Sequence, residues 1–103
     1  EMADSIKSDR NDMDVVYEIM LKMGVSLDTT ITYVEVRNKK AYVVGEFVLL
    51  ICLEDGIEAE DIEEMINYSP EKIICAEQCF KDDSSLSNTH YILKDKGIEF
   101  KLI

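Results

Sequence analysis

Residues 47–53 read Phe-Val-Leu-Leu-Ile-Cys-Leu and form the longest run without a polar side chain in the sequence. A strand exposed on one face alternates apolar and polar residues, so this run indicates a strand buried on both faces, as in a parallel sheet between helices. A short apolar strand at 72–76 and an alternating strand at 98–103 follow it. Apolar periodicity and helix-ending residues predict helices over 57–68 and 85–96. The second half of the chain therefore predicts a parallel β-α-β-α-β unit.

The first half of the chain predicts a different connection. Residues 31–36 and 41–45 are rich in β-branched and aromatic residues, and a polar turn, Arg37 to Lys40, separates them. This pattern indicates an antiparallel hairpin. Apolar residues at helical spacing, followed by Gly24, predict a helix over 13–23. We therefore expect an α/β fold: a single domain with a mixed five-stranded sheet, built from an N-terminal helix, the hairpin and the parallel unit.

The length of 103 residues and an apolar content of 47% suit one domain with its own core. Residues 1–11 are polar and without periodicity, which indicates a flexible start or the stump of a linker. We expect residues 12–103 to form the single α/β domain.

Acidic residues dominate the charge of the chain. Asp and Glu number 22 against 11 Lys and Arg, a formal net charge of −11, which argues against direct contact with DNA. Residues 54–71 carry eight acids and no base, a pattern typical of a solvated helix face. The basic cluster Arg37, Lys39 and Lys40 could touch phosphate. We favour the other role of such charges, which is to keep a hairpin soluble and monomeric.

The sequence shows no membrane-spanning apolar run and no signal-peptide pattern. Three cysteines, Cys52, Cys75 and Cys79, make an odd set that does not suit a disulfide framework. We therefore expect a cytoplasmic protein without contact to a membrane.

Most catalytic motifs are missing from the sequence, including glycine-rich phosphate loops and the nucleophile elbow. Cys75, Cys79 and His90 could be imagined as a zinc site, but structural zinc takes four ligands, usually at tighter spacing. A nucleophilic pair of Cys79 and His90 lacks a recognisable orienting group. We therefore predict no metal site and no catalytic residue.

Three carboxylates, Glu77, Asp82 and Asp83, follow a predicted parallel strand, where α/β folds tend to place their sites. They could bind a divalent cation or act as acid and base. The alternative is that Asp83 or Ser84 caps the next helix while Asp82 is solvated, and we favour this interpretation.

The end of the chain contains a series of short motifs: Glu77-Gln-Cys-Phe80, Asp82-Asp83, Ser87-Asn88-Thr89, Ile92-Leu93 and Lys96-Gly-Ile-Glu-Phe-Lys101. In this order they resemble the C-terminus of modification subunits of type III restriction–modification systems. The family-motif matches, of unknown role, are Phe80, Asp83, Asn88, Gly97 and Phe100. Weaker agreement extends to about residue 25, and Leu86 stands where the family usually has a lysine.

The resemblance implies a parent protein that is an S-adenosylmethionine-dependent adenine-N6 DNA methyltransferase. The Asp-Pro-Pro-Tyr motif of that family and its glycine-containing cofactor motif are missing from these 103 residues. We therefore expect a non-catalytic C-terminal domain without a cofactor of its own. By implication of the family, it supports dimerisation with another modification subunit or assembly with the restriction subunit.

A free-standing acidic α/β domain is the alternative. It would bind a divalent cation or a small ligand through Glu77, Asp82 and Asp83.

Overall fold

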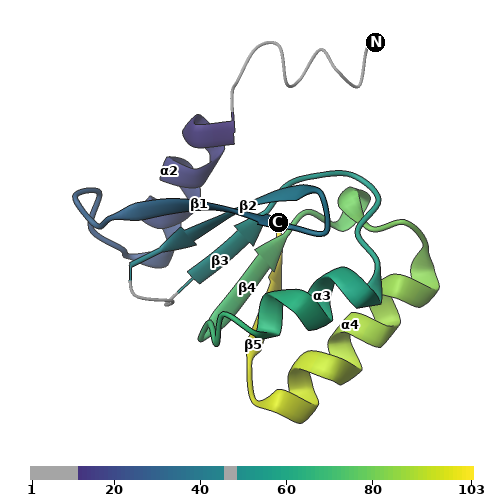
Figure 1. The fold of residues 1–103 in the computed structure, drawn as a ribbon. Coiled ribbons are helices and arrows are strands. Elements are labelled where there is room, and N and C mark those ends of the chain that lie inside the picture. The colour runs from purple at the N-terminus through teal and green to yellow at the C-terminus, as the bar shows by residue number, and fades with distance from the viewer. Residues whose placement is uncertain (1–11, 46–48) are drawn as a thin grey trace, which may run out of the picture.

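A computed structural model describes residues 12–45 and 49–103, and within them it confirms the α/β fold and the mixed five-stranded sheet (Figure 1). The described part of the chain begins with helix α2 (Asp12–Met23) and continues into the hairpin of β1 (Ile31–Val36) and β2 (Lys39–Val44). Strand β2 then pairs antiparallel with β3 (Leu49–Cys52). The predicted helix followed by an antiparallel hairpin is therefore confirmed.

The second half of the chain is the predicted parallel unit. After β3 come helix α3 (Ala59–Ile66), β4 (Lys72–Cys75), the short 3-10 helix η1 (Glu77–Cys79), helix α4 (Asp83–Lys96) and β5 (Glu99–Leu102). Strands β3, β4 and β5 are parallel neighbours, so the strand order in the sheet equals the order in the sequence.

Two apolar clusters cover the two faces of this sheet. Helices α3 and α4 pack on one face, where Leu50 and Ile73 are buried. Helix α2 packs on the opposite face, where Ile51 and Ile74 are buried (Figure 1). All four residues of β3 are buried, which is why its sequence lacks polar alternation.

The ends of several elements differ from the predictions. The hairpin turn contains only Arg37 and Asn38, both at positive φ (48° and 73°), as a tight two-residue turn requires. Ile57 does not begin α3 but forms an isolated parallel bridge with Phe80. The bridge gives the backbone of Ile57 hydrogen-bond partners outside a helix, and α3 begins two residues later.

Two parts of the predictions lie outside the described residues: the flexible start over 1–11, and residues Phe47 and Val48 of the predicted strand. Within the described ranges, every helix is too short or too polar to cross a membrane.

Candidate functional site at the start of helix α4

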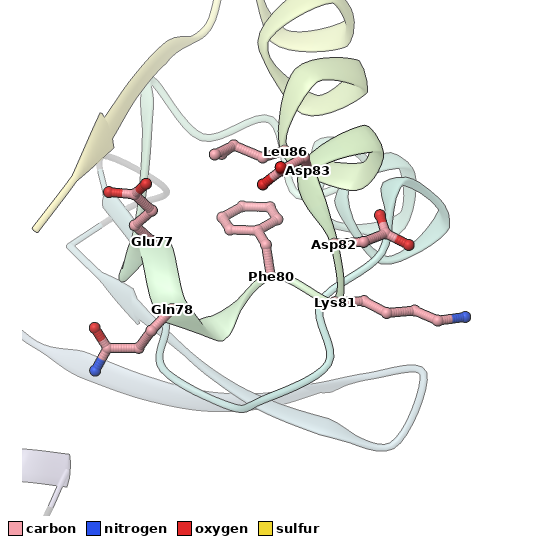
Figure 2. A pocket seen from close by; sticks show the side chains of 7 residues that line it. All are labelled: Glu77, Gln78, Phe80, Lys81, Asp82, Asp83 and Leu86. Carbon is pink, nitrogen blue, oxygen red and sulfur yellow. The ribbon is translucent and has the colours of Figure 1, made fainter.

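The segment between β4 and α4 forms a shallow groove at the carboxyl end of β4. Its volume is about 440 Å³, and its lining includes all three carboxylates that the sequence singled out (Figure 2). The lining residues are Glu77, Gln78, Phe80, Lys81, Asp82, Asp83 and Leu86. The position agrees with the tendency of α/β sheets to place sites beyond the carboxyl ends of their strands.

Asp82 is the residue that caps α4. Its side chain accepts a hydrogen bond from the backbone N–H of Ser85 at 2.8 Å, and its backbone is extended. This hydrogen bond lowers the pKa of Asp82 below its ordinary value. The prediction that Asp83 or Ser84 caps the helix was therefore wrong, because α4 already begins at Asp83.

A ladder of backbone hydrogen bonds joins this segment to the start of α3. Ile57 N–H donates to Cys79 C=O at 2.9 Å, and Lys81 N–H donates to Ile57 C=O at 2.9 Å. The Lys81 ammonium lies 3.0 Å from a carboxylate oxygen of Glu58. That contact raises the pKa of Lys81. The segment that lines the groove before α4 is therefore hydrogen-bonded to the segment before α3.

The three carboxylates do not converge. In Figure 2, Glu77 and Asp82 point away from each other on opposite sides of Phe80, and Asp83 lies on the first turn of α4. Across residues 12–45 and 49–103, no group of three or more His, Cys, Asp or Glu side chains is placed to hold a metal ion. Cation binding by Glu77, Asp82 and Asp83 stays a prediction.

Two of the five residues that match the family motif form an aromatic contact. The rings of Phe80 and Phe100 meet edge-on with centroids 5.8 Å apart, and the His90 ring lies 4.8 Å from Phe100. Gly97 ends α4 in the left-handed conformation. These residues therefore hold β4, α4 and β5 together.

The other two motif residues, Asp83 and Asn88, are exposed on α4. Their side chains are therefore accessible to a partner molecule.

The cysteines are buried thiols. Cys52, Cys75 and Cys79 all lie in the core, and Cys52 donates a hydrogen bond to Lys40 C=O. Burial raises the pKa of Cys52 to about 11 and that of Cys75 well above its ordinary value. The neutral thiol is the poor nucleophile, so neither of these residues has the character of a reactive cysteine. His90 is exposed and contacts Phe100.

Arg37 and Lys39 of the basic cluster form ion pairs with acids of the same chain. Asp61 is completely buried, and its two carboxylate oxygens lie 3.2 Å from Arg37 Nη1 and 3.1 Å from Lys39 Nζ. Glu58 N–H also donates to Asp61 at 2.9 Å. Two of the three bases considered for phosphate contact are therefore neutralised within the fold.

Asp61 was missed by the sequence analysis, which grouped it with the solvated acids. One signal was available. Glu58 and Asp61 have the three-residue spacing of a capping box, which directs the second side chain back toward the helix start. The spacing could predict that Asp61 caps the start of α3, but not that Arg37 and Lys39 of the hairpin would form ion pairs with it.

A comparison with protein-family models found no match to this chain, and a comparison with curated proteins found none either.

Proposed function

We propose that this chain is the non-catalytic C-terminal domain of a type III restriction–modification DNA adenine-N6 methyltransferase. Its role is to support dimerisation of the modification subunit or its assembly with the restriction subunit. Catalysis and S-adenosylmethionine binding belong to other parts of the parent protein, since the 103 residues hold one proline and therefore no Asp-Pro-Pro-Tyr motif.

One observation carries the proposal: three of the five residues that match the family motif hold the end of the domain together, whereas Asp83 and Asn88 are exposed. Phe80 and Phe100 touch across the start of α4 and β5, and Gly97 provides the turn between them. The motif therefore combines residues that pack the end of the domain with residues that are accessible to a partner subunit.

The surface of α3 provides a feature suited to assembly. Glu60, Glu63 and Glu64 are exposed on this helix, whereas Asp61 is used internally. An acidic face of this kind is complementary to a basic surface on a partner subunit. Such complementarity raises the rate of association more than the final affinity.

The first test is the coding region immediately upstream of Glu1. We expect it to continue the reading frame and to encode an Asp-Pro-Pro-Tyr motif. The parent protein is then compared with a form that lacks residues 12–103. The shortened form should still bind S-adenosylmethionine in calorimetry but should fail to form the complete complex in light scattering.

A matched pair of variants tests the acidic face. Replacing Glu60, Glu63 and Glu64 with Gln should slow association with the other subunits, while Glu77→Gln, at an exposed acid beyond β4, should leave it unchanged. A start codon near residue 1 without an upstream methyltransferase, or full assembly by the shortened form, would refute the proposal.

A further inference from the structure

Strand β1 presents an open backbone edge. Gly45 N–H donates to Thr30 C=O at 2.8 Å, so Thr30 and Gly45 are a hydrogen-bonded pair of the antiparallel ladder. Alternation along the ladder then directs the N–H and C=O groups of Ile31, Tyr33 and Glu35 away from β2. Among the described residues, only β2 pairs with β1, so these groups lie at the margin of the sheet.

The side chains of β1 do not protect this edge. Natural edge strands usually carry lysine or proline, or are very short. Strand β1 has six residues, Ile-Thr-Tyr-Val-Glu-Val, of which only Glu35 is charged. Tyr33 is 55% exposed and rests on Tyr42, with ring centroids 6.2 Å apart.

A groove of about 650 Å³ runs beside β1 on the face covered by α3. Thr32 and Val34 of β1 form one side, and Tyr68 after α3 forms another. The strand therefore offers both unpaired backbone groups and partly exposed apolar side chains.

We propose that β1 pairs antiparallel with β1 of a second copy of this chain, around a two-fold axis at Tyr33. The two five-stranded sheets then become one continuous sheet. This inference rests on the proposed function, because it names the surface through which the domain would join two modification subunits.

The sequence of β1 suits this self-pairing. With Tyr33 opposite Tyr33 of the second copy, Ile31 lies opposite Glu35, and no like charges face each other. The same register brings the exposed Asp28 before β1 opposite the uncharged Asn38 of the turn in the other copy, so that no acid faces it there. A net charge of −11 on each copy opposes association, so self-pairing is favoured at a strand where acids are sparse and none faces another.

The two-fold axis also joins the grooves of the two copies. Thr32 of one copy lies beside Val34 of the other, in the close, non-hydrogen-bonded arrangement. Pairing therefore brings the apolar parts of these side chains together while it satisfies the open backbone groups.

Sedimentation velocity of the full chain over a range of concentrations tests the proposal. We expect a reversible dimer. Tyr33→Lys and Tyr33→Glu should each raise its dissociation constant about tenfold or more, because like charges then face each other at the axis. Tyr91→Lys is the matched control: it makes the same change at a 75% exposed tyrosine of α4 and should leave the dissociation constant unchanged.

Mixing the two Tyr33 variants gives the sharpest result. Lys then faces Glu across the axis, so the mixture should associate at least as tightly as the original chain, although neither variant does so alone. Circular dichroism of each variant checks that the fold is intact. Failure of the mixture to associate, or equal weakening by Tyr91→Lys, would overturn the register.

A chain that stays monomeric at all concentrations would overturn this inference without touching the proposed function, provided that it still binds the rest of the methyltransferase or the restriction subunit. A dimer that responds to the Tyr33 variants as expected, in a chain with no methyltransferase upstream, would support this inference and refute the proposed function. Binding of an extended segment of another protein at β1, without self-association, would also overturn it.

Discussion

The two edges of the sheet differ in length, charge and pairing. Strand β1 has six residues, is antiparallel to its neighbour and carries one charged side chain. Strand β5 has four residues, is parallel to its neighbour and exposes Glu99 and Lys101. A short charged edge resists pairing with other chains, whereas a long edge rich in β-branched residues invites it. Among the residues that the structure describes, the sheet therefore has one short, charged edge and one longer edge with few charges.

The two edges are also attached to the core by different forces. Strand β5 is held by aromatic packing of Phe100 against Phe80 and by α4. The β1–β2 hairpin is tied to α3 by the ion pairs of the buried Asp61 with Arg37 and Lys39. Apolar packing tolerates salt and pH, whereas the ion pairs depend on the charge of every partner.

Removal of the aromatic anchor should have the largest effect. Phe100→Ala deletes a partly buried ring that contacts Phe80 and His90, and we expect it to lower the free energy of unfolding by about 2–3 kcal/mol, less than for a fully buried Phe. Urea denaturation measures this loss. Tyr91→Ala, at an exposed aromatic residue of α4, is the control and should change stability by less than about 0.5 kcal/mol. Equal losses in both variants would mean that β5 is not held by Phe100.

The corresponding change at the other edge is Asp61→Ala. It leaves Arg37 and Lys39 without their buried partner and removes the acceptor of Glu58 N–H, so we expect a loss of about 2–3 kcal/mol. Both cations are partly exposed and can be hydrated, which limits the effect.

Hydrogen exchange distinguishes the two edges. Asp61→Ala should speed exchange in β1 and β2 more than in β5. Glu60→Ala, at the exposed neighbouring acid, should affect neither strand. A uniform increase over the whole sheet would contradict a specific role of Asp61 at the hairpin.

High pH should destabilise the centre of the sheet, where Cys52 lies in β3 between the two edges. Burial raises the pKa of Cys52 from 9.0 to about 11. Above pH 9 the unfolded chain therefore loses this proton while the folded chain keeps it. The free energy of unfolding should therefore fall by about 2 kcal/mol between pH 9 and pH 11 because of this thiol.

The measurement is urea denaturation at several pH values, with Cys52→Ala for comparison. Tyrosine and lysine also titrate in this range, so the informative quantity is the difference in pH dependence between the two proteins. The Cys52→Ala chain should lose less stability between pH 9 and 11. Identical slopes would show that the thiol ionises normally in the folded state.

The order of the elements could be predicted because each depends on a local pattern. The continuous apolar run at 47–53 indicated a strand buried on both faces, and β3, which covers residues 49–52 of this run, is buried at every position. Element ends were less accurate, as Ile57 and Asp83 illustrate. Whether Ile57 belongs to the helix depends on its bridge with the distant Phe80. Whether Asp83 caps α4 or lies inside it depends on which of two adjacent acids reaches a free N–H group.

The candidate site was predicted in part. The sequence brought Glu77, Asp82 and Asp83 to one region, and they line one groove. It could not say that Asp82 would be used as the cap, or that the side chains would diverge (Figure 2). Local spacing determines which residues are close along the chain, but side-chain directions follow from the packing of η1 against the start of α4.

The helices, the hairpin and the parallel unit could be predicted from the sequence, because apolar periodicity and turn residues act over a few positions. The roles of the charged residues depend on contacts that form only in the folded chain. Asp61 looked like its exposed neighbours in a run of acids, yet folding brings two cations of a distant hairpin to it. The open edge of β1 likewise exists only once the strand order is known. The position of a strand at the edge of the sheet and the ionic partners of a buried acid are properties of the assembled fold, so no local pattern can predict them.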